Sequence, residues 1–379
     1  MRFIYADNAA TTRLSDTALK AMLPYLREEY GNASTLYKLG RSAHNAVASA
    51  RRTFADGIQA IPAEIFFTSG GTESDNWAIK GTAHRLARLG KRHIVTDNIE
   101  HHAVLNSVSA LAREGFEITY VKADADGVVP PQAVRAAIRP DTALVSVMFA
   151  NNELGTIQPV TEIGRICHDA GVLFHCDAVQ AAGILPINVQ AMNIDLLSIS
   201  AHKFHGAKGV GVLYARRGCA PEVYIDGGEQ EYHHRAGTEN VAGIVGAAAA
   251  FAECLGEREH KAARLAQMRD EIQAGLLKIP EAVVNGVNAA RLPGMLNMSF
   301  SGVDGQSLIF ALDSNGIAAS SGSACASGSI SPSHVLLALG LPYSLAHGSL
   351  RISLGRYNTS GEVNTVIQTV TRVITEMRA

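Results

Sequence analysis

The sequence of 379 residues has no strong excess of charge of either sign. Its 33 lysines and arginines stand against 35 aspartates and glutamates, which gives a formal net charge of −2. Proteins that bind nucleic acid or an anionic membrane through electrostatics usually carry a basic patch or stripe, so neither partner is expected here. Hydrophobic residues make up 47% and charged residues 18% of the chain, which is the composition of a globular protein and not of a disordered chain.

Cysteines are few, and a long apolar run and a leader sequence are both missing. The five cysteines are Cys167, Cys176, Cys219, Cys254 and Cys325. They are too scattered for a disulfide framework and include no CxxC pair, so no metal site is expected. The longest apolar stretch, residues 241–252, falls short of the roughly 18 residues that span a bilayer, and MRFIYADNAATT lacks the basic start and apolar core of a signal peptide. We therefore expect a cytoplasmic protein.

Short β-rich runs alternate with stretches long enough for helices. Strands are expected at 64–68, 93–97, 117–122, 143–149, 172–177, 196–200 and 210–214, and helices at 73–89 and 160–170, among others. Runs such as ALVSVMF and GVGVLY are apolar on both faces, which is typical of a mostly parallel sheet covered by helices. Such a sheet presents its functional loops just after the strands.

The pattern changes at about Phe251. A long charged helix follows, then a strand-like LNMSF, another helix, a Gly/Ser loop and a C-terminal helix. The sequence therefore predicts an α/β protein with a large domain over residues 15–255. A smaller α+β domain is predicted from residues 1–14 and 256–379.

Residues 66–76 combine a strand end, a Gly-Gly turn and a helix start rich in acids and hydroxyls. The free N–H groups of such a helix start, with the Thr72 hydroxyl, would suit a phosphate. A merely capped helix would explain the same residues. The segment matches neither GxxxxGK[ST] nor GxGxxG, which disfavours nucleoside triphosphates and dinucleotides, and with them a nicotinamide-dependent oxidoreductase.

Asp177 and Lys203 each follow an apolar run. An acid in the position of Asp177 can hold a ring nitrogen protonated, although it could instead cap a helix. A lysine at the edge of an apolar site, such as Lys203, has a lowered pKa and can form a Schiff base. Lys208 competes for that role. An acid, a lysine and a phosphate cradle together fit pyridoxal phosphate.

Other segments offer groups for a substrate. Arg351, on an alternating strand, suits bidentate capture of a carboxylate, or else forms a salt bridge at the rim of the site. Cys325 stands among ten small residues at 320–329, a composition that predicts a nucleophile on a flexible tether. Asn152 and His101 also follow strands, although a histidine there is more often a satisfied loop residue than a catalyst.

These residues lie in runs that resemble the NifS/IscS-type cysteine desulfurases of the class V aminotransferase group, over nearly the whole chain. The matching runs, in the order of that family, are YADNAATT, FTSGGTESDNWAIKG, EHHAVL, ANNELGTIQPV, FHCDAVQAAG, SAHKFHGAKGVG, RAGTENVAGIVG, GIAASSGSACASGS, SPSHVLLALG and HGSLRISLGRY. The resemblance implies the fold-type I architecture of pyridoxal-phosphate enzymes and a homodimer.

The resemblance also implies a role for each site residue. Cofactor contacts are implied for Gly71, Thr72, Asn152, Asp177, Gln180, Ser200, His202, Lys203 and, from the partner subunit, Thr238. Among these, Lys203 would bind the cofactor covalently, Asp177 would pair with the ring nitrogen and Gln180 would reach the ring oxygen O3′. His101 would stack on the ring and exchange protons. Asn152 and Arg351 would receive L-cysteine, and Cys325 would take its sulfur as a persulfide.

The activity implied is the conversion of L-cysteine to L-alanine, with the sulfur passed to an iron–sulfur scaffold or another sulfur-acceptor protein. This would supply iron–sulfur cluster assembly or other thio-cofactors. A selenocysteine lyase or a cysteine or cystine lyase of the same fold remains an alternative, as does a catalytically idle sulfur carrier. Ala33, Tyr37 and Tyr232 depart from the usual Pro, His and Arg of the family, which bears on the site entrance and the dimer contacts.

Overall fold

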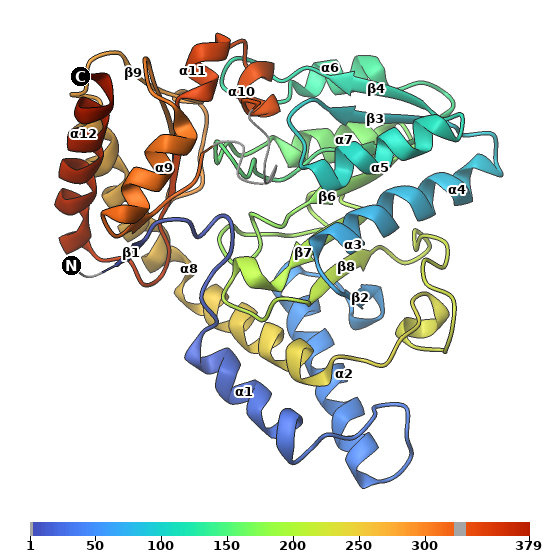
Figure 1. Cartoon of the computed structure of the whole chain (residues 1–379). Helices are drawn as coiled ribbons and strands as arrows, with labels where there is room; N and C mark the ends of the chain where they lie inside the picture. The colour runs from blue at the N-terminus through green and yellow to red at the C-terminus, as the bar shows by residue number, and fades with distance from the viewer. Residues whose placement is uncertain (1–2, 322–330) are drawn as a thin grey trace.

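The computed structural model describes residues 3–321 and 331–379 (Figure 1). Its strands are β1 (Ile4–Tyr5), β2 (Ile65–Thr68), β3 (His93–Asp97), β4 (Glu117–Val121), β5 (Thr142–Ser146), β6 (Leu173–Asp177), β7 (Leu196–Ser200), β8 (Gly211–Ala215), β9 (Ala282–Val284), β10 (Met295–Phe300), β11 (Ile317–Ala318) and β12 (Ser349–Ser353). Its α-helices are α1 (Asp16–Arg27), α2 (Lys38–Ile58), α3 (Gly71–Asn76), α4 (Thr82–Ala87), α5 (His102–Arg113), α6 (Pro131–Ala137), α7 (Val160–Asp169), α8 (Val241–Leu276), α9 (Gly305–Ser314), α10 (His334–Ala338), α11 (Tyr343–His347) and α12 (Val363–Arg378).

A seven-stranded sheet in the order β2-β8-β7-β6-β5-β3-β4 forms the centre of the larger part of the molecule. Strands β4, β3, β5, β6 and β7 are parallel, which confirms the predicted mostly parallel α/β sheet. Strand β8 runs antiparallel to both of its neighbours. The expectation that functional loops follow every strand is therefore wrong for β8, because its first residue, Gly211, pairs with Ser200 at the end of β7.

The strands are apolar on both faces because helices cover both. One face packs against α2, α7 and α8, and its core contains Phe54, Val145 and Phe251. The other face packs against α4 and α5 and includes Trp77 and Val108. All seven runs predicted as strands lie in this sheet; the largest shift in the ends is at 143–149, where β5 is Thr142–Ser146.

The helix predicted at 73–89 begins at Gly71, and residues Trp77–Gly81 form a wider π-helical turn between α3 and α4. The helix expected from about Phe251 begins ten residues earlier, at Val241. The apolar stretch 241–252 and the charged stretch after it are thus one helix, α8, of 36 residues. Its first half packs in the core of the large sheet and its second half, from Leu265, packs in a second core.

The second core lies around the antiparallel sheet β12-β10-β9 and the helices α9 and α12 (Figure 1). Strand β1 joins it by pairing in parallel with β11, so that Ile4 and Ala6 are buried there. Val335 and Leu336 of α10, although late in the chain, pack into the first core. The division into 15–255 and the remainder stays a prediction.

Within residues 3–321 and 331–379, none of the helices is both long and apolar enough to cross a bilayer. The same ranges contain no group of three or more histidines, cysteines or acids placed to hold a metal ion. Cys167, Cys176, Cys219 and Cys254 are free thiols.

Candidate active site

A cavity of about 330 Å³ opens where β6 and β7 end, beside the start of α3. Ten predicted site residues line it: Gly71, Thr72, His101, Asn152, Asp177, Gln180, Ser200, His202, Lys203 and Arg351. They come from segments spread over 280 positions, 351 minus 71: Arg351 comes from β12 of the smaller sheet, and the other nine come from the part of the chain that forms the seven-stranded sheet. Two predictions are not placed there. Thr238 is exposed and is not among the lining residues, and Cys325 lies outside the described residues.

The start of α3 packs closely against the ends of β6 and β7. A Cβ atom on Gly71 would lie 2.6 Å from Val179 Cγ2, so the close approach requires glycine. A second hollow adjoins the cavity here, lined by residues 69–73, Ser200, His202 and Lys208, among others. The N–H groups of the first helical turn have no partner within the helix. Together with two basic side chains they make this end of the site suitable for an anion.

Sequence reasoning did not find the role of Arg235 at this helix start. The Glu73 carboxylate accepts the Ser69 N–H at 2.8 Å and the Arg235 Nε–H at 2.8 Å. Although burial alone raises the pKa of Glu73, these hydrogen bonds lower it overall. Arg235 thus balances an acid that would otherwise repel an anion at the helix start. Its signal was the RAGTENV run, which the family resemblance includes.

Lys203 ends a short 3₁₀ turn, Ala201–Lys203, directly after β7. Its ammonium donates to the carbonyl oxygens of Ala9, at 2.5 Å, and Ala10, at 2.9 Å. The Gln180 side chain donates to the same Ala9 oxygen at 3.0 Å. The N-terminal segment therefore holds both side chains at the wall of the cavity. Lys208, the competitor, is exposed and lines only the adjoining hollow.

Asp177 is the last residue of β6 and is buried. Its Oδ1 accepts the Val179 N–H at 2.8 Å, so the residue caps the following turn and also lines the cavity. Burial raises the pKa of Asp177 to about 6, while the Val179 N–H and the Lys203 charge favour the carboxylate. A positively charged ring nitrogen beside it would favour the carboxylate further.

His101 is the N-cap of α5, and its Nδ1 accepts the Ala103 N–H at 3.1 Å. The neutral ring must then carry its proton on Nε2. Burial, the Lys203 charge and the neighbouring histidines lower the pKa of His101 to about 4. The ring is therefore neutral at physiological pH and can donate through Nε2. His101 is therefore both a loop residue whose hydrogen bonding is satisfied at the start of α5 and a residue that lines the cavity.

His202 follows Ser200 at the end of β7, on the anion-binding side of the cavity. Its Nδ1 lies 3.1 Å from the Thr11 hydroxyl. Burial and the charges of Lys203 and Lys208 lower the pKa of His202 to about 4. An anion in the adjoining hollow would oppose this shift, because a negative charge favours the protonated ring.

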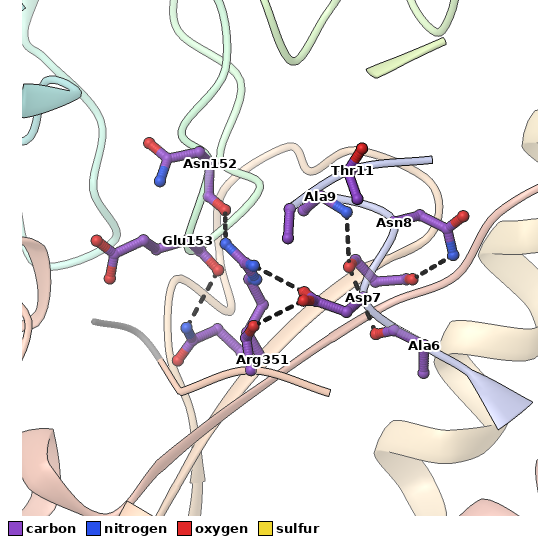
Figure 2. A network of polar contacts seen from close by, with 12 residues as sticks. Ala6, Asp7, Asn8, Ala9, Thr11, Asn152, Glu153 and Arg351 are labelled. Atoms are coloured by element: carbon purple, nitrogen blue, oxygen red, sulfur yellow. Dashed lines mark hydrogen bonds and ion pairs between the residues drawn. The ribbon is translucent and has the colours of Figure 1, made fainter. Parts of the chain in front are cut away.

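Arg351, on β12, is 1% exposed, so the predicted alternative of a salt bridge at the rim is wrong. It does form an ion pair, with Asp7, but inside the protein (Figure 2). The Arg351 Nη2 donates to Asp7 Oδ1 at 2.8 Å, and Nη1 donates to the Asn152 backbone oxygen at 2.8 Å. Asn152 thereby contributes its main chain to the site. Asp7 lies in the YADNAATT run and was not predicted as a site residue.

Comparison with known proteins gives matches over almost the entire chain. Residues 4–366 match the family model described as aminotransferase class-V. A cysteine desulfurase IscS from Methanosarcina thermophila is 49% identical over 375 residues, which cover 99% of this chain and 93% of that protein. One from Dictyoglomus turgidum is 46% identical over 378 residues, which cover 100% and 96%. A solved NifS-like protein superposes with a TM-score of 0.93 at 38% identity, covering 99% of this chain and 100% of that one. SspA, solved in complex with cysteine, gives a TM-score of 0.83 at 36% identity, covering 94% and 100%.

Proposed function

The chain belongs to the class-V aminotransferase family, and from this membership we propose that it is an L-cysteine desulfurase with pyridoxal phosphate as its cofactor. Its fold is the fold-type I architecture of that family. The observation that carries the proposal is the single cavity that Lys203, Asp177 and Arg351 share. These three side chains supply what a pyridoxal-phosphate enzyme needs for an amino-acid substrate: an amine, an acid and a cation for a carboxylate.

The residues of the cavity fit the cofactor. The helix start at Gly71 is too close to Val179 for any side chain, which leaves backbone N–H groups facing the hollow beside His202. We assign the phosphate to this end, held by Gly71, Thr72, Ser200 and His202, with Thr238 of the partner subunit. The ring would be held by His101, Asp177 and Gln180, with Asp177 as the partner of its nitrogen and Gln180 as the partner of O3′.

Pyridoxal phosphate, when bound, withdraws electrons from the α-carbon of an amino acid joined to it. The chain's own groups handle the protons. With the cofactor bound, the Lys203 amine would take the proton from the α-carbon of the substrate. The Ala9 and Ala10 carbonyl oxygens, which accept from this ammonium in the structure, would stabilise the charge that Nζ gains. Asp177 keeps the ring nitrogen protonated.

We assign the sulfur transfer to Cys325. Its thiolate forms a bond with the substrate sulfur while the carbon–sulfur bond breaks, and the bonding electrons return to the substrate carbon. Protonation of that carbon completes L-alanine, and the enzyme is left with a persulfide on Cys325. We assign to His101 the role of a neutral hydrogen-bond donor to the reacting groups through Nε2, a role supported by its Nδ1, which already accepts a backbone N–H.

A homodimer belongs to the proposal. Thr238 is exposed and does not line the cavity of its own chain, as expected of a residue that serves a neighbouring subunit. Helix α1 also exposes Leu19, Leu23 and Leu26, which a second copy would cover. Light scattering coupled to size exclusion should give twice the chain mass. A Thr238→Ala variant should weaken cofactor binding without dissociating the dimer.

We also propose that the sulfur passes to an iron–sulfur scaffold or another sulfur-acceptor protein in the cytoplasm. The four free thiols in the described part of the chain support a reducing compartment. Incubation of the persulfide form with a purified scaffold protein should move labelled sulfur to it. Retention of the label on the enzyme would contradict this part of the proposal.

The function is tested by incubating the holoenzyme with L-cysteine, assaying alanine and mapping the persulfide by mass spectrometry. Cys325→Ala should lose alanine formation, and Cys219→Ala, a matched change at a half-buried thiol, should keep it. Alanine formation at the wild-type rate in Cys325→Ala would refute the persulfide step. A wild-type protein that forms alanine only from L-selenocysteine would be a selenocysteine lyase, and one that forms none would be an idle carrier.

A further inference from the structure

The substrate arginine already has an acid beside it. The Asp7 carboxylate, from the segment after β1, accepts a hydrogen bond of 2.8 Å from the Arg351 guanidinium. The arginine side chain is 2% exposed and the aspartate side chain 16%, so water screens the pair only weakly. Figure 2 shows the two groups facing each other, with Asn152 on the other side of the guanidinium. The formal charge at the carboxylate subsite is therefore zero, not +1.

Arg351 nevertheless keeps donors for a ligand. A guanidinium has five N–H groups, and the hydrogen bonds to Asp7 and Asn152 use two of them. Its Nε is buried and has no hydrogen-bond partner among the described residues. Because Arg351 also lines the cavity, a carboxylate can be received while the bond to Asp7 persists.

Asp7 is itself fixed in place. Its Oδ2 accepts the Ser320 hydroxyl at 2.9 Å, and its backbone forms a bridge with Ser353 on β12. The next residue, Asn8, donates its backbone N–H to the Ser353 oxygen at 3.1 Å. An acid held on both sides cannot swing away when a second carboxylate arrives. The two negative charges must then share one guanidinium.

We propose that Asp7 is a positioning residue that orients Arg351 and sets the affinity of the site for the substrate carboxylate, holding it lower than a lone buried arginine would give. This inference rests on the proposed function. L-cysteine and L-alanine carry the same carboxylate, so strong binding to Arg351 would hold the product as firmly as the substrate. The Asp7 charge weakens both and lets alanine leave.

The test is an Asp7→Asn holoenzyme, in which the amide oxygen can still accept from Arg351 while the charge is gone. The dissociation constant of L-alanine, measured by calorimetry, should fall about tenfold. L-alaninamide, which lacks the carboxylate, should bind both proteins alike. Ser320→Ala removes one contact of Asp7 but keeps its charge and the backbone bridge to Ser353 that holds it beside Arg351, so the affinity of this variant for L-alanine should stay within about twofold of wild type.

The same variant should lower the KM for L-cysteine without raising kcat, whereas a purely structural role would raise KM. An unchanged or larger dissociation constant for L-alanine in a folded Asp7→Asn protein would overturn the inference. If that variant does not fold, Asp7→Ser removes the charge with a smaller side chain and is held to the same criterion. The proposed function is tested by alanine formation from L-cysteine by the wild type, and the Asp7 inference by the dissociation constant of L-alanine. Failure of one is therefore distinguishable from failure of the other.

Discussion

Replacing Glu231 by alanine should lower the free energy of unfolding by about 3 kcal/mol. Glu231 and Arg51 are both 7% exposed and form a bidentate pair, with N–O distances of 2.6 and 2.9 Å. The glutamate also accepts the Phe67 N–H at 3.0 Å. The Arg51 guanidinium lies 4.7 Å from the Phe67 ring centroid and 5.0 Å from that of Tyr232.

The magnitude follows from three contributions. Removing one partner of a buried ion pair costs about 3–5 kcal/mol, because the other charge stays buried. The orphaned Phe67 N–H adds about 1–3 kcal/mol. Against these stands relief of backbone strain as the turn relaxes, since Glu231, Tyr232 and His233 have φ of 47, 58 and 66°. With about 4 kcal/mol for the pair, about 2 kcal/mol for the N–H and about 1 kcal/mol regained at each of the three left-handed residues, the net cost is about 3 kcal/mol.

The assay is urea unfolding followed by the fluorescence of Trp77, the one tryptophan of the chain. Its ring lies 5.5 Å from Phe66, which in turn contacts Tyr232, so the probe reports on this part of the core. Glu376→Ala is the matched control, because its pair with Arg372 is exposed and should contribute only about 0.3–0.5 kcal/mol. A loss of less than about 1 kcal/mol in the free energy of unfolding of Glu231→Ala would refute the conclusion that the lost ion pair outweighs the relief of backbone strain.

Two further predictions concern Gly71, in the wall of the cavity, and Glu153, which follows the wall residue Asn152. Gly71→Ala should weaken cofactor binding about tenfold in an absorbance titration, because the new Cβ would lie 2.6 Å from Val179 Cγ2. Adding Val179→Ala should restore binding. Normal cofactor binding by the Gly71→Ala single variant would contradict the close approach. Burial raises the pKa of Glu153 from 4.5 to about 7, so its contribution to stability is present below pH 4.5 and is lost as pH rises through 7. Glu153→Gln should accordingly be more stable than wild type at pH 8, by up to about 3 kcal/mol, and not at pH 4; equal stability at both pH values in urea unfolding would show that the carboxyl is not held neutral.

The strands could be predicted because they leave local patterns, and so could candidates such as Thr72, Asp177 and Lys203 at strand ends, whereas Gln180, Ser200, His202 and Thr238 came only from the family resemblance. A strand covered on both faces is a continuous apolar run, and the polar residue that ends it, such as Asp177 or Ser200, marks the edge of the sheet. Periodicity reports burial and not direction, which is why the reversal of β8 was missed. The start of α8 was missed for a similar reason. Its first half is apolar because the core surrounds it, and this hides the amphipathic pattern that the second half displays.

The partners of the site residues were beyond prediction. Asp7 and Arg351 are 344 positions apart, and an ion pair across that separation has no spacing to recognise. The acceptors of Lys203 are backbone oxygens of two alanines, whose identity gives no hint of the contact. The Glu73–Arg235 pair is similar, since each side chain alone reads as an ordinary surface charge. Side-chain chemistry can be read from a sequence, whereas the charge balance of a site depends on the folded chain.

The N-terminal segment connects the charge balance of the site to the binding of both the cofactor and the substrate. Residues 6–12 contain Asp7, which accepts from Arg351, the proposed carboxylate ligand, and the Ala9 and Ala10 carbonyls, which accept from Lys203. Two residues further on, the Thr12 hydroxyl donates to the backbone oxygen of His202, a proposed phosphate ligand, at 2.8 Å. The same short segment thus contacts residues proposed to bind the carboxylate, the cofactor aldehyde and the phosphate, and it begins in the second core at Ala6. A shift of this segment would displace all three groups together, so variants of residues 8–11 should change cofactor affinity and substrate affinity jointly. Variants of Asp7 should change substrate affinity without changing cofactor affinity, because Asp7 contacts Arg351 alone among these groups.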